Sequence, residues 1–393
     1  MTSNPVKASP QRLEYLDAIR GVAALAVLWS HYFFAFGPSR LKPLMTIPSA
    51  LFLDGYAAVV MFFVLSGYVL SLGQTGHARF RDFRIGGFWI RRVCRIVPPF
   101  AAALLLSYLL CAWVYTVQAD NQPALTHWGQ RHWSDAKFHA PLAEYLRALV
   151  MVLPDTHFPL VPQAWTLRIE MGMSLLLPCM LLVVNRSSAW LVAFTAIAIV
   201  ALDVYIYLSH FVLGILVARH QPELCAALNR RPLRQSCALL VGLVLYGNRF
   251  APDWLLPALP KPLMVLITGL GAATLLVLVL ANARAQAVLS LRPFRFLGRI
   301  SYSLYLLHLA VILTFSQAFI RFLNTLGCTA DASFWLGMLA TTLATLPVAY
   351  LFNRAIEQPS IRLGKQLARA VEGKGGTSTF PNDTRSHPND TAA

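Results

Sequence analysis

Long apolar runs, separated by short polar segments, recur along almost the whole chain. A helix needs about 20 mostly apolar residues to cross a lipid bilayer. Runs of this kind predict ten transmembrane helices, near residues 17–36, 54–73, 97–117, 164–184, 188–202, 203–219, 236–249, 262–281, 300–320 and 333–353. The pattern therefore predicts an all-α integral membrane protein, in which the fifth, sixth and seventh helices have the weakest patterns.

The positions of Lys and Arg predict the orientation of these helices. Cytoplasmic loops of membrane proteins are enriched in both residues. With the N-terminus inside, the inside segments hold 24 of the 33 Lys and Arg, the outside segments hold eight, and Arg168 lies within a predicted helix. This alternating bias indicates an even number of crossings, with both termini on the cytoplasmic side (N-in and C-in).

Composition agrees with a multi-pass membrane protein. Charged residues make up 13% of the chain, against roughly 25% in an average soluble protein. The net charge of +16 comes from basic residues scattered between apolar runs, so we expect a lipid bilayer and no nucleic acid as partner. The six cysteines form no C-x-x-C pair and no metal-like spacing with histidine, which predicts neither a zinc site nor a disulfide framework.

The chain divides into three predicted parts. Residues 1–15 are a polar cytoplasmic segment, followed by a retained first helix because no small-x-small cleavage site follows the apolar run. Residues 16–360 form the transmembrane domain, and residues 361–393 form a cytoplasmic, largely disordered tail. The long outside segment, 118–163, carries His127, Trp128, His132 and Trp133, which are either anchors at the membrane surface or a wall over a substrate cleft.

The first predicted helix, "LDAIRGVAALAVLWSHYFF", carries Arg20 near its inner end and His31 more than half-way across. Eleven residues turn a helix by three full turns and 20°, with a rise of about 16 Å, so the two side chains share one face. A histidine at this depth is a functional candidate or a packing residue that bonds another helix, and Arg20 alone fits a topology signal as well.

A basic cluster, "FWIRRVCRIVPPF", precedes the third predicted helix. Arg92 and Arg95 are three residues apart and share a helical face, whereas Arg91 points away. Guanidinium groups at the cytoplasmic rim suit phosphates. The alternative is an ordinary run of inside positive charges.

Two more polar groups lie within predicted helices. In "QAWTLRIEMGMSLLLP", Arg168 and Glu170 are two residues apart and point to different faces, so Glu170 needs a partner on another helix or in a cavity. In "FLGRISYSLYLLHLAVI", Ser301, Tyr305 and His308 form a polar stripe at i, i+4 and i+7. Such a stripe faces the interior of a helix bundle, where it binds substrate or joins helices.

Together these segments resemble the acyltransferase-3 family of integral-membrane acyltransferases. The matching pieces, in order, are "LDAIRGVAALAVLWSH" with its Arg-x10-His motif, "FFVLSGYVLS", "RRVCRIVPPF", "WTLRIE", "LGRISYSLYLLH" and "IEQPS". They extend from residue 16 to 360. The chain departs from the family pattern at Arg168, a bulky charged residue within the fourth motif, and at Gln358, where a basic residue is common.

The resemblance implies ten core helices and transfer of an acyl group, usually acetyl, from cytoplasmic acyl-CoA to an acceptor such as a surface glycan. Carried over to this chain, it assigns Arg20, His31 and Glu170 to catalysis and Arg20, Arg92 and Arg95 to acyl-CoA. We expect Trp165, Tyr305 and His308 to bind the acceptor. The fused extracytoplasmic domain of some relatives is expected to be absent here.

We therefore expect an O-acyltransferase of the bacterial inner membrane. Its donor would be acetyl-CoA, its acceptor a glycan or lipid-linked saccharide, and no metal is required. His31 acts as general base, which is typically worth about 10²- to 10⁴-fold in rate, or it carries the acyl group in a covalent intermediate. The alternatives are a transporter of a glycan precursor, whose intramembrane charges line the transport path, and an inactive membrane protein that keeps the fold as a sensor.

Overall fold

The computed structural model describes residues 11–72, 74–75, 83–111, 125–130, 133, 146, 148–149, 160–201, 206–229, 231–252 and 259–372. In these ranges every regular element is a helix and no strand occurs. The prediction of an all-α fold is confirmed.

The helices of ten or more residues, all but the last, coincide with predicted apolar runs. They are α1 (Gln11–Phe36), α4 (Gly55–Ser71), α6 (Ile85–Leu110), α10 (Ala164–Arg186), α11 (Ser188–Ala201), α12 (Tyr207–Arg219), α14 (Pro232–Tyr246), α15 (Lys261–Ala281), α17 (Arg292–Val311), α19 (Ala330–Phe352) and α20 (Gln358–Glu372). Shorter helices connect them, among them α2 (Pro38–Leu41), α3 (Ala50–Leu53), α8 (His127–Gln130), α13 (Gln221–Leu228), α16 (Ala283–Leu289) and α18 (Gln317–Thr325). Each of the ten predicted runs thus overlaps a helix where the structure describes it.

By length and hydropathy, six helical segments of the described chain can cross a membrane. Helices α12 and α13 meet at a bend of 76°, and the number is seven if this pair counts as one crossing. Three further apolar helices, α4, α11 and α14, have 10–17 residues. The membrane character of the fold is therefore clear, whereas ten crossings and the N-in, C-in orientation stay predictions.

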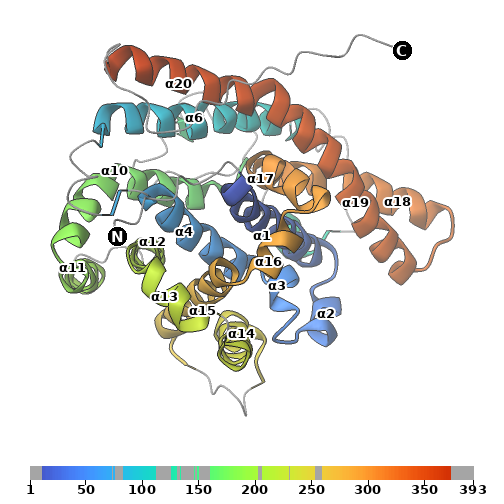
Figure 1. Cartoon of the computed structure of the whole chain (residues 1–393). Coiled ribbons are helices and arrows are strands. Elements are labelled where there is room, and N and C mark those ends of the chain that lie inside the picture. The colour runs from blue at the N-terminus through green and yellow to red at the C-terminus, as the bar shows by residue number, and fades with distance from the viewer. Residues whose placement is uncertain are drawn as a thin grey trace, which may run out of the picture.

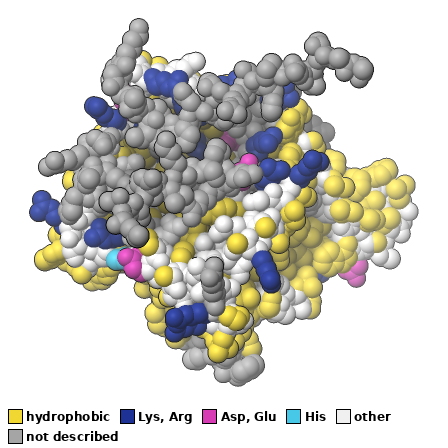
Figure 2. Space-filling model, viewed as in Figure 1, with side chains coloured by type: hydrophobic (Ala, Val, Ile, Leu, Met, Phe, Trp, Pro, Cys, Tyr) yellow, Lys and Arg dark blue, Asp and Glu magenta, His cyan; other side chains and the backbone are white. Residues whose placement is uncertain are grey.

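Large apolar side chains cover much of the outer surface. On α11, Trp190, Phe194 and Ile197 each expose more than half of their surface, and Leu339 and Leu343 do so on α19. Figure 2 shows hydrophobic side chains spread over the α18–α19 end of the molecule, while Lys and Arg gather mostly elsewhere on this face. Exposed apolar patches of this size fit contact with lipid.

Helix α1 lies at the centre of the molecule, packed along α17 and α4 (Figure 1). Two glycines let α1 and α17 approach at backbone contact. A Cβ on Gly21 would lie 2.5 Å from the Gly298 nitrogen, and a Cβ on Gly298 would lie 2.5 Å from the Asp17 carbonyl carbon. Small residues allow such close helix packing in membranes, and this crossing fixes α17 against α1 near their N-terminal ends.

Helix α6 begins twelve residues before the predicted start, because it continues through Pro98 and Pro99. Proline lacks an N–H group, so Pro98 leaves the carbonyl oxygen of Cys94 without its helical partner. The hydroxyl of Ser360 on α20 donates a hydrogen bond to this oxygen. The loss is thus compensated from a neighbouring helix, and the arginines that we placed before the helix lie within it.

Helix α20 also changes the expected boundary of the tail. It runs side by side with α6 (Figure 1) and ends with an ion pair from Arg91 to Glu372, 3.0 Å long. Residues 361–372, which we assigned to the tail, are helical and packed. Most of the outside segment 118–163 and the tail from residue 373 lie outside the described residues.

Candidate functional site

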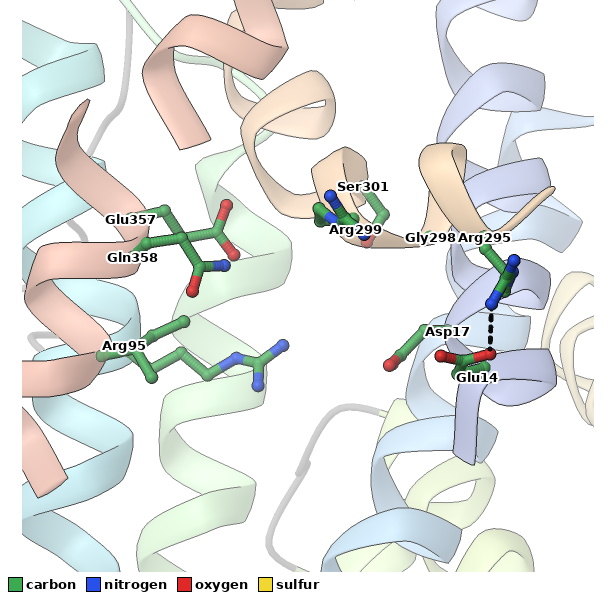
Figure 3. A pocket seen from close by; sticks show the side chains of 10 residues that line it. Glu14, Asp17, Arg95, Arg295, Gly298, Arg299, Ser301, Glu357 and Gln358 are labelled. Atoms are coloured by element: carbon green, nitrogen blue, oxygen red, sulfur yellow. Dashed lines mark hydrogen bonds and ion pairs between the residues drawn. The ribbon is translucent and has the colours of Figure 1, made fainter. Parts of the chain in front are cut away.

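A polar cavity of about 290 Å³ lies where α1, α6 and α17 meet the start of α20 and the helical turn Asn353–Glu357 that precedes it. Its lining residues come from helix ends that the charge pattern assigns to the inner side: Glu14, Asp17, Arg95, Arg295, Gly298, Arg299, Ser301, Glu357, Gln358 and Ile361. Figure 3 shows Arg95 reaching from α6 across this space toward Asp17 of α1. The cavity brings together groups as far apart in sequence as Glu14 and Ile361.

Several of the charges around the cavity are paired with each other. Arg295 bonds Glu14 at 3.1 Å, and Arg20 bonds Asp17 at 2.9 Å. The buried Glu357 carboxylate accepts hydrogen bonds from Ser303 and from Asn353, each 2.7 Å long. Ion pairs thus neutralise Glu14 and Asp17, whereas Glu357 is held by neutral donors and keeps its charge beside Arg95 and Arg299.

Arg92 and Arg95 have different surroundings although they share the R-x-x-R motif. Arg92 is buried against α10, where its Nη2 atom lies 2.5 Å from Oε1 of Glu170 and its Nε atom donates to Ser174 at 3.1 Å. Arg95 is exposed and lines the cavity. Three residues turn a helix by 300°, so the two side chains point 60° apart, and this offset separates an ion-paired group from a cavity-lining one.

Glu170 is the centre of an electrostatic cluster. The charges of Arg20, Arg92 and Arg95 all act on its carboxylate. The structure therefore brings together four of the site residues predicted from sequence, although Arg20 and Arg92 each have an acidic partner of their own.

The two predicted histidines meet farther along α1 and α17. The Nδ1 atom of His31 lies 2.8 Å from Nε2 of His308. His308 is completely buried, and its Nδ1 atom donates to the Tyr305 carbonyl oxygen at 2.8 Å. The ring of Trp128, on α8, stacks on His31 with centroids 5.3 Å apart. Of the two interpretations of the outside aromatic residues, this contact favours a wall over the histidine pair.

Gln163 and Thr166, which open α10, hold this part of α17. The Gln163 side chain donates to the carbonyl oxygens of Tyr305 and Leu306, at 3.3 and 2.8 Å. The Tyr305 hydroxyl lies 2.7 Å from that of Thr166. Tyr305 is thus a buried member of the helix interface, and its hydroxyl is engaged in that interface.

Trp165 lies apart from the histidine pair. Its ring packs against Tyr207 of α12, with centroids 5.3 Å apart. This contact joins Trp165 to α12, whereas the histidine pair joins α1 and α17, so the role of Trp165 in acceptor binding stays a prediction.

Sequence reasoning missed Arg295, Arg299 and Gln163. The first two lie in "RPFRFLGR" at the start of α17, which we treated as inside positive charges. Their roles depend on which helix ends converge, and a charge count does not contain that information. Gln163 stands directly before the "WTLRIE" motif, but its bonds reach α17 across 142 positions.

Comparisons with known proteins agree with this arrangement. The chain is 24% identical to O-acetyltransferase PaAT-1 of Phomopsis amygdali over 92% of this chain and 86% of that protein. It is 25% identical to the putative peptidoglycan O-acetyltransferase YrhL of Bacillus subtilis, over 76% of this chain and 48% of that protein. It is also 33% identical to Protein 2 in picA locus of Rhizobium radiobacter, over 28% of this chain and 51% of that protein. No solved structure matches the chain.

The match to a family model covers nearly the whole transmembrane part. The model described as an acyltransferase domain, Acyl_transf_3, matches residues 13–354. This range includes the histidine pair, the Arg92–Glu170 pair and most of the residues around the cavity. The chain therefore belongs to the acyltransferase-3 family.

Proposed function

We propose that this protein is a membrane O-acyltransferase that moves an acyl group, most simply acetyl, from cytoplasmic acyl-CoA to a hydroxyl group of a glycan or lipid-linked saccharide. Family membership supports the reaction class. Two relatives carry the name O-acetyltransferase, and one of these names includes peptidoglycan. We place it in the bacterial inner membrane; two of the three named relatives are bacterial and one is fungal.

One observation carries this proposal: a polar stripe connects the arginine-lined cavity with the histidine pair. Ser301 lines the cavity, and Tyr305 and His308 follow it on the same face of α17. From Arg299 to His308 the helix rises about 14 Å. This length is comparable to that of the extended pantetheine arm of CoA, so a donor with its phosphates at the cavity can present its thioester near His31.

The donor phosphates would bind to Arg95 and Arg299. Both side chains are exposed, and both line the cavity. Guanidinium groups make strong paired hydrogen bonds to phosphate oxygens. Arg20 and Arg92, which the resemblance also assigned to the donor, then act through charge, since each is already paired with a carboxylate.

The reaction needs one base and no external oxidant or reductant. As the acceptor oxygen attacks the thioester carbonyl carbon, its proton passes to His31. The carbon–sulfur bond breaks, its electron pair goes to sulfur, and the imidazolium returns the proton to give free CoA thiol. Such a base is worth about 10²- to 10⁴-fold in rate.

The test uses the full-length protein in proteoliposomes, [1-¹⁴C]acetyl-CoA, and membranes from the source cells as the supply of acceptor. We expect label to appear in a saccharide fraction and to be released by mild base, as for an ester. His31→Gln should lower the rate at least about 100-fold while acetyl-CoA binding stays within a few-fold. His210→Gln is the control, because His210 is another histidine within the helix bundle but lies on α12 and bonds a backbone carbonyl of α15.

Absence of label with a properly inserted protein would refute acyl transfer. If unlabelled saccharide crossed the membrane in the same vesicles, the transporter alternative would replace it. Retention of more than about a tenth of the rate in His31→Gln would mean that His31 is not the general base.

The proposed topology has a separate test. Cysteines introduced into residues 118–163 should react with a membrane-impermeant thiol reagent in intact spheroplasts, while cysteines after residue 354 should react only after lysis. The reverse pattern would contradict the N-in, C-in orientation.

A further inference from the structure

We infer that His308 is a positioning residue that fixes the tautomer of His31, so that the lone pair of His31 lies on Nε2 and this atom receives the acceptor proton. The inference rests on the proposed function for the identity of that proton. The arrangement of hydrogen atoms itself follows from two hydrogen bonds of His308 and from the burial of its ring.

The first step is the proton on His308. Its Nδ1 atom lies 2.8 Å from the Tyr305 carbonyl oxygen. A carbonyl oxygen only accepts, so Nδ1 of His308 carries a hydrogen. The same carbonyl also accepts from Gln163 of α10 at 3.3 Å, and this second helix therefore helps to hold the carbonyl at which His308 points.

The second step is the charge state of His308. The ring is completely buried, and its described hydrogen-bond partners are a backbone carbonyl and another imidazole. Neither partner brings a negative charge to offset the cost of burying a cation. A neutral ring has one hydrogen, which is already on Nδ1, so Nε2 of His308 is an acceptor.

The third step transfers this constraint to His31. Its Nδ1 atom lies 2.8 Å from Nε2 of His308. Since Nε2 of His308 accepts, Nδ1 of His31 donates, and Nε2 of neutral His31 then holds the lone pair. A histidine is often oriented in this way by the partner of its second nitrogen.

The geometry of the two rings fits a hydrogen bond between them. Their planes differ by 1° and their centroids lie 5.0 Å apart. Parallel rings in stacking contact have planes about 3.5 Å apart, whereas the two nitrogens here are 2.8 Å apart. The rings therefore lie edge to edge in one plane, where the lone pair of Nε2 points along the bond.

Trp128 completes the arrangement from the outer side. Its ring lies over the His31 ring at an interplanar angle of 21°. An aromatic face attracts a cation within about 6 Å of its centroid. The stacked ring and the acceptor atom of His308 therefore both stabilise His31 after it has taken the proton.

The test compares His308→Leu with His308→Gln in the full-length protein in lipid nanodiscs. Glutamine has both an amide donor for the Tyr305 carbonyl and an oxygen acceptor for His31, whereas leucine has neither. For acetyl transfer from acetyl-CoA we expect His308→Leu to lower kcat about 100-fold with the KM for acetyl-CoA within twofold. The kcat of His308→Gln should be at least tenfold higher than that of His308→Leu.

A second readout does not depend on activity. In protein labelled with ¹⁵N-histidine, the His31 signals are those lost in His31→Gln. We expect a protonated Nδ1 and an unprotonated Nε2 in wild type and in His308→Gln, and a mixture of tautomers in His308→Leu. His210→Gln should leave the His31 signals unchanged, because a substitution on α12 does not alter the hydrogen bond between His31 and His308.

Three results separate the possible errors. A protonated Nε2 on His31 in the neutral wild-type protein would overturn the inference, and so would His308→Leu that keeps more than half of the wild-type kcat. Wild-type protein with the inferred tautomer but no acyl transfer would uphold the positioning role and refute the proposed function.

Discussion

Substitution of the two arginines of the R-x-x-R motif should change different properties. Loss of Arg92 should lower the stability of the fold, and loss of Arg95 should raise the KM for acetyl-CoA. Removing one partner of a buried ion pair costs about 3–5 kcal/mol, because the other charge stays buried and unpaired. Glu170 keeps 24% of its side chain exposed, so we take the lower end, about 3 kcal/mol, for Arg92→Met and for Glu170→Gln. This corresponds to a roughly 100-fold loss in the folding equilibrium.

The double variant Arg92→Met/Glu170→Met should recover most of this loss. It removes both charges at once, and replacing a buried pair by apolar side chains is often neutral or stabilising. We expect its free energy of unfolding to lie within about 1 kcal/mol of wild type. The measurement is reversible unfolding in mixed micelles of increasing SDS fraction, with the coupling taken from the complete double-mutant cycle.

Arg95→Met is the matched control on the same helix. Its exposed side chain should contribute less than about 0.5 kcal/mol to stability. A lost hydrogen bond to a charged phosphate costs about 1.5–3 kcal/mol, so the KM for acetyl-CoA should rise about 10- to 100-fold. If Arg92→Met is as stable as wild type and raises that KM as Arg95→Met does, Arg92 binds the donor and our assignment of the two arginines fails.

Two further substitutions test the packing that supports the site. Gly298→Ala should destabilise the protein by about 1–3 kcal/mol, because its Cβ would lie 2.5 Å from the Asp17 carbonyl carbon. The control is Gly172→Ala, which should be neutral or stabilising by up to about 1 kcal/mol, because no described atom lies near its Cβ. Ser360→Ala should cost about 1–3 kcal/mol in thermal unfolding, because the Cys94 carbonyl loses the partner that compensates for Pro98; a variant as stable as wild type would show that this hydrogen bond contributes nothing.

The sequence predicted the helices well because hydrophobicity acts locally. A run of about 20 apolar residues is visible without knowledge of its neighbours, and all ten runs lie on helices in the described chain. The start of α6 was misplaced because Pro98 normally ends a helix pattern. The Cys94 carbonyl oxygen that Pro98 leaves without a helical partner accepts a hydrogen bond from Ser360, 266 positions from Cys94, and no local pattern contains that partner.

The sequence predicted candidate site residues, but it did not predict how they pair. Periodicity placed Arg92 and Arg95 on one face, and it also placed Ser301, Tyr305 and His308 in one stripe. Which helix each face meets depends on packing between distant segments. The separation of Arg92 from Arg95 follows from a 60° offset on α6 and from the position of Glu170 on α10.

One feature of the sequence predicts that His31 and His308 lie at the same level, once the crossing of α1 and α17 is known. In "GVAALAVLWSH" a glycine precedes His31 by ten residues, and in "GRISYSLYLLH" a glycine precedes His308 by the same number. The two glycines meet at backbone contact, and the two histidines meet at 2.8 Å. Equal steps of ten residues give equal rises of about 15 Å and equal rotations. Because the two helices run in the same direction from the glycine contact, equal rises put His31 and His308 at the same level, and the glycine crossing thus sets the axial register at which they meet.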